Sequence, residues 1–313
     1  MTDMTYRHLG DSGLMVSTVG LGCNNFGMRI DASATERVVS AALDHGITMF
    51  DTSDSYGDSE IFLSKALGSR RSEIVLATKF GSDLRGANGP DWGARGSRRY
   101  IRKAVERSLS RLGTDYIDLY QLHMPDPSTP IEETLSALSD LVHEGKVRYI
   151  GNSNFSGWQI ADADWIARTT GSVRFISAQN HYNLIERGAE TDVLPACERF
   201  GLGQLPYFPL ASGLLTGKYQ RGVAAPADGR IAAWHMDSML SDTNFDKVDA
   251  LSTFADERGL SLLQVALGGL ASRPAIASVI AGATSPEQVA ANVEAGLWTP
   301  TEDDRAALNL ALS

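Results

Sequence analysis

The chain has 313 residues, of which 43% are hydrophobic and 21% are charged, a composition typical of a globular protein with a sizeable apolar core. Its net charge of −10 argues against nucleic acid or an anionic membrane surface as a bulk partner. The two cysteines, Cys23 and Cys197, follow no disulfide or metal-binding spacing. No apolar run predicts a signal peptide or a membrane span, so we expect a cytoplasmic protein.

Short β-rich segments alternate regularly with segments of helical periodicity. Strands are expected at residues 17–22, 47–51, 73–79, 116–123, 147–154, 174–180, 202–209 and 276–282. The clearest helices are expected at 32–46, 97–113 and 128–145, with Ser97 and Ser128 as N-caps, Pro130 at an early helical position, and Gly46, Gly113 and Gly145 at the C-terminal ends. Eight such units without a linker predict a single domain over residues 1–313 that forms a closed (β/α)8 barrel, or TIM barrel, rather than a doubly wound sheet.

Two segments lie outside this alternation. RHLGDSGLMVS (7–17) predicts a short N-terminal β-hairpin around Asp11, Ser12 and Gly13, placed to plug one end of the barrel. The connection from Thr216 to Thr243, after the seventh strand, is long and rich in Gly, Ala and Pro, which predicts a functional loop.

Polar residues close the apolar strands at their carboxyl ends. In chain order these residues are Asp51, Lys79, His123, Ser153, Asn154, Gln179, Asn180 and Tyr207. Because the carboxyl ends of parallel strands meet on one face of a barrel, the pattern predicts one pocket that holds all of them.

Tyr56, in the loop after Asp51, completes a set with Lys79 and His123 that is suited to proton transfer. A lysine ammonium favours the phenolate and lowers the pKa of a neighbouring tyrosine, a carboxylate holds the lysine, and a histidine can donate a hydrogen bond to a carbonyl oxygen. Taken singly, Asp51 and Lys79 predict a structural ion pair, and Tyr56 and His123 predict packing residues. Their order on successive strand ends favours carbonyl reduction, and a nicotinamide cofactor is implied as the hydride source. Glu60 is assigned to the start of the next helix and to no chemistry.

A series of motifs resembles the aldo-keto reductase superfamily along almost the whole chain. The motifs are FDTSDSYGDSE (50–60), ATKFG (77–81), LYQLHMPDP (119–127), IGNSNFS (150–156), PYFPLASGLLTGKY (206–219) and GATSPEQVAANVEA (282–295). The resemblance implies a (β/α)8 barrel that reduces a small-molecule carbonyl with NAD(P)H. By position it implies that Tyr56 is the general acid, that Lys79 and Asp51 tune it, and that His123 orients the carbonyl.

The same resemblance implies a cofactor site along the strand ends. Ser153, Asn154 and Gln179 are expected to hold the nicotinamide carboxamide, and Tyr207 to stack on its ring. Phe208, Pro209, Leu210, Ala211, Ser212 and Gly213 with Lys218 and Arg230 are expected around the pyrophosphate, Gly282, Ala283, Thr284, Gln288 and Asn292 around the adenosine, and Asn24 beside the site in the first strand-to-helix loop. NADPH is favoured over NADH, although Gly282 and Gln288 replace the Lys and Arg of many members and Ala291 replaces a frequent acid. Phe208 stands where a small serine is common.

Two other functions are compatible with parts of the pattern. Potassium-channel β-subunits are similar and serve as cofactor-binding regulatory partners, and a barrel isomerase or aldolase would use Lys79 as a Schiff-base amine. GLGCNNFG (20–27) does not have the glycine spacing of a dinucleotide-binding Rossmann loop, and the basic segment 97–111 is interpreted as a solvated helix face. The histidines have no metal-binding spacing, so no metal is expected. Specificity is expected in loops 23–30, 84–96 and 219–242, with Trp92 and Trp234 as candidate lining residues; the sequence specifies neither the carbonyl nor the number of subunits.

Overall fold

Eight parallel strands close into a barrel in the computed structural model of the chain, which describes residues 4–226 and 229–312. The strands are β3 (Val19–Gly22), β4 (Met49–Asp51), β5 (Val75–Phe80), β6 (Ile117–Leu122), β7 (Val147–Ser153), β8 (Phe175–Gln179), β9 (Gly203–Gln204) and β10 (Val279–Gly282), paired in the order β10-β3-β4-β5-β6-β7-β8-β9. The sheet closes between its two edges, where the Gln204 amide donates to the Ala275 carbonyl at 2.8 Å and the Gln204 carbonyl accepts from the Ala277 amide at 3.0 Å. The predicted (β/α)8 barrel is confirmed.

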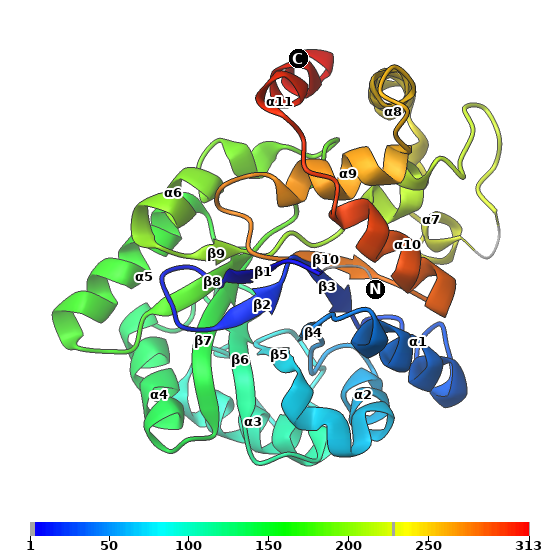
Figure 1. Cartoon of the computed structure of the whole chain (residues 1–313). Helices are drawn as coiled ribbons and strands as arrows, with labels where there is room; N and C mark the ends of the chain where they lie inside the picture. Colours follow the sequence, from blue (N-terminus) through cyan, green and yellow to red (C-terminus); the bar gives the residue numbers. More distant parts are fainter. Residues whose placement is uncertain (1–3, 227–228, 313) are drawn as a thin grey trace.

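Helices surround the outside of the barrel (Figure 1). Those that connect successive strands are α1 (Ala32–Asp44), α2 (Ser59–Leu67), α3 (Arg98–Leu112), α4 (Ile131–His143), α5 (Gly157–Thr170), α6 (Val193–Phe200) and α9 (Leu262–Ala271), and α10 (Pro286–Gly296) follows the last strand. The additional helices are α7 (Arg230–Ala233), α8 (Asp242–Asp256) and α11 (Glu302–Ala311), together with the 3₁₀ segments η1 (Gly68–Glu73), η2 (Gly188–Glu190), η3 (Ala211–Thr216) and η4 (Asp237–Leu240).

Most predicted ends lie within two residues of those observed, although β10 begins at Val279 rather than at residue 276. Two further corrections concern a helix cap and a strand length. Ser97 caps α3 by accepting from the Tyr100 amide, but Ser128 does not cap α4, whose N-cap is Pro130, because the Ser128 amide is held in a turn by Asp126 Oδ1 at 2.8 Å. The seventh barrel strand is also much shorter than predicted: β9 ends at Gln204, because Pro206 and Pro209 have no amide hydrogen to continue a ladder.

The connection predicted as a functional loop after the seventh strand contains regular structure. It includes the short elements α7 and η4, and α8 begins before its predicted end. Residues 227 and 228 of this connection lie outside the described residues.

The barrel interior and the layer between barrel and helices form separate hydrophobic cores. The inner core contains alternate strand residues such as Met49, Ala77 and Leu119, together with Leu9 and Val16 from the N-terminal hairpin. The hairpin consists of β1 (Tyr6–His8) and β2 (Met15–Ser17), and Figure 1 shows it crossing one end of the barrel. Its turn approaches the barrel so closely that a Cβ on Gly10, at φ +59°, would lie 2.4 Å from the Gly201 carbonyl oxygen. The predicted hairpin therefore closes the amino-terminal end of the barrel.

Among the described residues, no helix is both long and apolar enough to cross a bilayer.

Replacing Leu9 by Ala should destabilise the fold, because Leu9 is 0% exposed at the closed end of the barrel and its loss leaves a cavity. We expect the free energy of unfolding, measured by urea denaturation, to fall by about 2–5 kcal/mol. Met15→Ala is the matched control on the same hairpin, since Met15 is 42% exposed. Equal effects of the two substitutions would contradict the role of the hairpin as a plug.

Candidate active site

The polar strand ends form a layer above the apolar interior, because they continue the inward-facing alternation of their strands. Asp51 follows Met49 on the inner face of β4, and Lys79 follows Ala77 on the inner face of β5. The register pairs Lys79 with Gln121 of β6. The inward-facing residues of these strands thus change from apolar to polar at one level of the barrel, near the carboxyl ends of the strands.

A buried ion pair lies at the centre of this layer. Lys79 Nζ donates to Asp51 Oδ2 at 2.6 Å and to the Thr52 carbonyl at 2.9 Å. Asp51 Oδ1 accepts hydrogen bonds from Gln121 Nε2 at 3.2 Å and from Gln179 Nε2 at 2.9 Å. Lys79 is 0% and Asp51 3% exposed, so neither charge is solvated and each depends on the other.

Tyr56 meets this ion pair from the loop between β4 and α2. Lys79 Nζ donates to the Tyr56 hydroxyl at 3.4 Å and lies 4.9 Å from the centre of the ring. The loop is fixed by the hydroxyls of Thr52 and Ser59, which are 2.8 Å apart, and by Gly57, whose φ of 55° provides the predicted turn.

The pKa values make this pair a proton donor beside a cation. Lys79 lowers the pKa of the Tyr56 phenol, as predicted, but burial is the larger effect and the pKa of Tyr56 is raised above its ordinary value. The prediction of a net lowered pKa is therefore wrong for this structure. Burial also opposes the charge of Lys79, but Asp51 and Tyr56 outweigh it and raise the pKa of Lys79. At neutral pH the phenol keeps its proton next to an ammonium ion.

His123 is a neutral neighbour of Tyr56. Their rings are 5.8 Å apart and nearly perpendicular, at 84°. Burial, with a contribution from Lys79, lowers the pKa of His123 to about 3. Its Nδ1 lies 3.1 Å from Ser53 Oγ and 2.9 Å from Ser82 Oγ. When a hydroxyl donates to Nδ1, the ring hydrogen is on Nε2, from which it can be donated to a carbonyl oxygen.

These groups open into a cavity of about 630 Å³ that runs from the strand ends to α10. Most of the predicted site residues line it: Asn24, Asp51, Tyr56, His123, Ser153, Asn154, Gln179, Tyr207, Phe208, Pro209, Leu210, Ser212, Gly213, Lys218, Arg230, Gly282, Thr284, Gln288 and Asn292. Residues of six strand-end loops thus share one concave site, as the barrel prediction requires.

Four residues predicted in the pocket do not line the cavity. Lys79 lies beneath its floor and acts through Asp51 and Tyr56, and Ala211 and Ala283 are each 1% exposed in the surrounding core. Asn180 is also buried, because its Nδ2 donates to the Phe155 carbonyl at 2.9 Å. Of the two candidate lining tryptophans, Trp234 lines the cavity, whereas Trp92 lies outside it and is 77% exposed.

The cavity also contains residues that sequence analysis did not assign. They are Gly22, Cys23, Asn25, Arg29, Met124, Thr216, Leu263, Ile280 and Ala291. Arg29 belongs to the loop 23–30 that was expected to carry specificity, and Met124 directly follows His123 at a strand end. Their positions in the sequence could therefore have predicted that they line the cavity. Leu263, on α9, had no such signal.

An aromatic platform forms one wall of the cavity. The Tyr207 ring is stacked on His181, with ring centres 5.4 Å apart and an interplanar angle of 8°. Its hydroxyl donates to Asn154 Oδ1 at 2.9 Å, and Phe208 packs edge-on at 5.3 Å. The platform is therefore held rigidly and presents a flat face on which a planar ring can stack.

One side of the cavity is cationic. Arg230 Nη2 donates to Asn24 Oδ1 at 3.2 Å and to Asn25 Oδ1 at 3.0 Å, and its guanidinium lies 4.8 Å from the centre of the Trp234 ring. Burial, and then the neighbouring charge of Arg29, lower the pKa of Arg230 to about 10. Two like charges in one partly enclosed site favour an anion between them.

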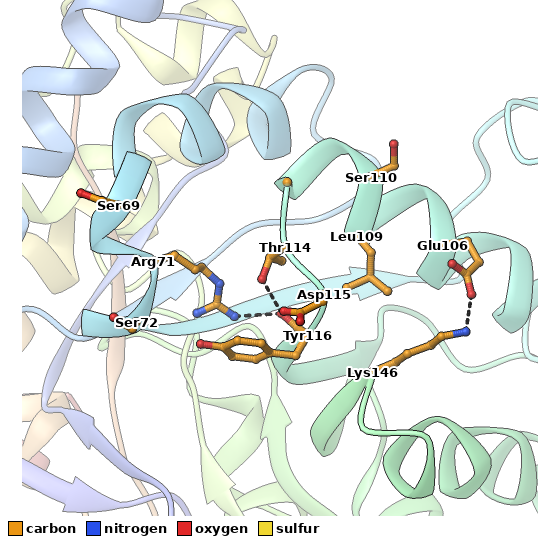
Figure 2. A pocket seen from close by; sticks show the side chains of 11 residues that line it. Ser69, Arg71, Ser72, Glu106, Leu109, Ser110, Thr114, Asp115, Tyr116 and Lys146 are labelled. Atoms are coloured by element: carbon orange, nitrogen blue, oxygen red, sulfur yellow. Dashed lines mark hydrogen bonds and ion pairs between the residues drawn. The ribbon is translucent and has the colours of Figure 1, made fainter.

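A second hollow, of about 870 Å³, lies at the opposite end of the barrel (Figure 2). It is lined where β5, β6 and β7 begin, by residues such as Arg71, Tyr116 and Lys146. Its cations are bonded to protein carboxylates: Arg71 to Asp118 at 2.8 Å and Lys146 to Glu106 at 2.5 Å. The amino-terminal face of such a barrel generally serves stability, and these pairs fit that role.

No group of histidine, cysteine or acidic side chains with the arrangement of a metal site occurs within residues 4–226 and 229–312. Both cysteines are buried and free.

A (β/α)8 barrel with a Tyr–Lys–Asp–His cluster at the floor of a deep cavity has the architecture of a barrel enzyme whose active site lies at the carboxyl ends of the strands. A sequence model of the aldo/keto reductase family matches residues 18–310. The chain belongs to the aldo/keto reductase family.

Three relatives illustrate the range of names within this family. The chain is 39% identical over 304 residues to a probable voltage-gated potassium channel subunit beta of Arabidopsis thaliana, an alignment that covers 93% of this chain and 91% of that protein. It is 36% identical to an uncharacterized oxidoreductase of Bacillus subtilis, with 93% and 91% covered. It is 34% identical to the L-glyceraldehyde 3-phosphate reductase of Escherichia coli K12, with 93% and 87% covered.

The buried ion pair predicts a strong coupling between Asp51 and Lys79. Asp51→Asn and Lys79→Met should each lower the free energy of unfolding by about 3–5 kcal/mol, because each leaves one uncompensated buried charge. The double variant should lose clearly less than the sum, as measured by urea denaturation at pH 7. The exposed pair Arg70–Glu73 is the control and should show no such coupling. Additive losses at Asp51 and Lys79 would contradict the interpretation.

Proposed function

We propose that the protein is an NADPH-dependent oxidoreductase that reduces an aldehyde or ketone to the alcohol. The observation that carries the proposal is the Tyr56 hydroxyl, 3.4 Å from the buried Lys79 ammonium and beside a neutral His123, at the floor of a deep cavity. A protonated phenol next to a fixed cation is suited to give its proton to a developing alkoxide.

Each residue of the cluster has a separate task. Tyr56 donates the proton from its hydroxyl to the carbonyl oxygen, and Lys79 stabilises the phenolate that remains. Asp51 neutralises Lys79, so that the cation can stay buried without drawing water into the site. His123 donates from Nε2 to the carbonyl oxygen and orients the substrate. The cofactor, when bound, supplies the hydride to the carbonyl carbon.

The chemistry of the cavity lining supports a nicotinamide dinucleotide as the cofactor. The rigid Tyr207 face suits a nicotinamide ring, and the amides of Asn154 and Gln179 with the Ser153 hydroxyl suit its carboxamide. Residues 208–213 with Lys218 would hold the pyrophosphate, whereas Arg230, expected with them from sequence, lies beside Arg29 and is proposed to hold a second phosphate. Residues 282–284 with Gln288 and Asn292 would surround the adenosine, beside the start of α10, which Ser285 caps and Pro286 begins.

The two arginines on the cationic side of the cavity favour NADPH over NADH. Arg29 and Arg230 lie close enough for one to lower the pKa of the other, and a phosphate dianion would relieve that repulsion. The ribose 2′-phosphate of NADPH would supply such an anion. This support comes from Arg29 of the first strand-to-helix loop and Arg230 of α7, and not from Gly282 or Gln288.

A regulatory function resembling that of potassium-channel β-subunits is the second candidate. It is favoured by the names of relatives such as the Arabidopsis protein, whereas the names of the B. subtilis and E. coli relatives favour an enzyme. Cofactor that copurifies with the protein, with negligible turnover on every carbonyl offered, would support the regulatory candidate. A panel of aldehydes that includes L-glyceraldehyde 3-phosphate tests both.

Schiff-base chemistry at Lys79 is disfavoured. A nucleophilic lysine needs a lowered pKa, but Asp51 and Tyr56 raise the pKa of Lys79, and the ammonium is 0% exposed.

Tyr56→Phe should lower kcat for carbonyl reduction by about 10²–10⁴-fold, because it removes the proton donor and keeps the ring. The assay follows the loss of NADPH absorbance, and binding of NADPH by fluorescence should be little changed. Full activity of Tyr56→Phe would falsify the mechanism.

Arg230→Gln should weaken the binding of NADPH by about 10–150-fold, since it removes a charged hydrogen bond, and that of NADH by much less. Arg221→Gln is the control, because Arg221 bonds the carboxylates of Asp242, Asp246 and Asp249 and does not line the cavity. Equal weakening of both cofactors by Arg230→Gln would remove the argument for a 2′-phosphate site.

A further inference from the structure

Asp54, two residues before Tyr56, is a buried acid that the proposed mechanism does not use. It is 8% exposed and does not line the cavity, so its side chain lies behind the catalytic loop. Its Oδ2 has no hydrogen-bond partner among the residues the structure describes. Its Oδ1 is 3.5 Å from Ser53 Oγ. A carboxylate this poorly satisfied is costly, and the cost falls when the group takes up a proton.

The charged groups around Asp54 favour its protonated form further. Glu60 of α2 is 1% exposed and repels a second negative charge. Arg111 of α3 could compensate, but its Nε donates to Glu60 Oε2 at 2.6 Å, and the other Glu60 oxygen accepts from Thr78 Oγ1 at 2.7 Å. Glu60, which the sequence assigned only to the start of a helix, thus forms an ion pair with Arg111, the cation nearest to Asp54.

The remaining groups that face Asp54 are uncharged. They are Asn88, which is 3% exposed and donates to the Tyr100 hydroxyl at 3.1 Å, and the phenols of Tyr100 on α3 and Tyr120 on β6. The pKa values of both phenols are raised by burial and also by the charge of Asp54. Burial first, and then Glu60, raise the pKa of Asp54 to about 7. The group therefore changes its charge in the neutral range.

Ser53 connects this acid to the active site. Its hydroxyl lies 3.5 Å from Asp54 Oδ1, 3.1 Å from His123 Nδ1 and 2.9 Å from Ser55 Oγ, and it has only one hydrogen to donate. Which neighbour receives that hydrogen depends on whether Asp54 is an acid that donates or an anion that accepts. Nε2 is at the opposite edge of the His123 ring, which lines the cavity.

We propose that Asp54 is a positioning residue that selects the ring tautomer of His123 through the hydroxyl of Ser53. The proposal rests on the proposed function in one respect only. The tautomer with hydrogen on Nε2 matters for catalysis because it can donate to a carbonyl oxygen. It makes carbonyl reduction depend on a group that touches neither substrate nor cofactor.

The two states differ by one proton. In the first, the Asp54 acid donates to Ser53 Oγ, Ser53 donates to His123 Nδ1, and the ring hydrogen is on Nε2. In the second, Asp54 has released its proton to solvent, Ser53 donates to the carboxylate, and the ring hydrogen has moved to Nδ1, from which it is donated to a serine oxygen. Nε2 then has no hydrogen to give.

Ser82 competes with Ser53 for the same ring nitrogen, since its Oγ is 2.9 Å from Nδ1. A hydrogen donated by Ser82 would keep Nε2–H in either state. The coupling should therefore be partial in the native protein, larger in Ser82→Ala, and absent in Ser53→Ala.

The test compares the native protein with Asp54→Asn, whose amide can donate to Ser53 at every pH. Long-range ¹H–¹⁵N spectra of protein labelled at histidine nitrogen report the His123 tautomer between pH 5 and pH 9, with His123→Gln used for assignment. We expect the native signal to shift from Nε2–H towards Nδ1–H around pH 7, and the Asp54→Asn signal to stay at Nε2–H. Asp58→Asn, an exposed neighbour in the same loop, should behave as the native protein.

Kinetics and stability give two further readouts. The native kcat/KM for reduction should fall by up to about tenfold between pH 6 and pH 8, as the protonated fraction of Asp54 falls, and Asp54→Asn should flatten this limb. Because the pKa of Asp54 is raised on folding, its stabilising effect is present at low pH and is lost as pH rises through about 7. The Tm of Asp54→Asn relative to the native protein should therefore be higher at pH 8 than at pH 5.

The proposal is overturned if the native His123 tautomer is constant from pH 5 to pH 9, or if Asp54→Asn or Ser53→Ala shows the native shift. A Tm difference that does not depend on pH would also overturn it, because Asp54 would then not titrate. If no carbonyl is reduced, the proposed function fails, and the spectra still decide the tautomer.

Discussion

The buried Lys79–Asp51 ion pair is the constraint on which the site depends. Two charges with almost no exposure are tolerated only because they are 2.6 Å apart and because Gln121 and Gln179 satisfy the second carboxylate oxygen. This geometry needs four strands in fixed register, because β5, β6 and β8 all deliver groups to the one carboxylate on β4. Lys79 then holds the hydroxyl of Tyr56 by a hydrogen bond. His123 is positioned by β6, the strand next to the one that carries Lys79.

The barrel keeps its two ends chemically distinct. At the amino-terminal end, Leu9 and Val16 of the hairpin extend the apolar interior and exclude water. At the other end, the same inward-facing positions become polar and open into the cavity. The second hollow, outside the starts of β5 to β7, holds cations already bonded to carboxylates. Because the amino-terminal end of the barrel excludes water, electrostatic interactions among the polar groups at the carboxyl-terminal end act in a low dielectric.

Burial and charge oppose each other in this cluster, and their balance differs from group to group. For Tyr56 burial outweighs the nearby ammonium, so the phenol keeps its proton and can donate it. For His123 burial and Lys79 act together and keep the ring neutral. For Asp54 burial and Glu60 act together, and the only nearby cation is engaged elsewhere, among the residues described. One loop therefore carries two acids, a phenol and a carboxyl group, whose pKa values are both raised by burial, against a neighbouring cation for Tyr56 and together with a neighbouring anion for Asp54.

The sequence by itself determined the barrel, the plugging hairpin and the list of strand-end residues, because period-two apolar runs ended by polar groups are local features that a parallel barrel must bring to one face. It could not determine the length of the seventh strand, the helix turns in the long connection or the N-cap of α4, which depend on proline and turn contacts with distant segments. Only the tertiary structure decided the direction of the Tyr56 pKa shift, the place of Arg29 beside Arg230, and the isolation of Asp54. The physical reason is the same in each case: desolvation and charge coupling depend on which groups from other strands and loops surround a side chain, and that information is absent from its local sequence.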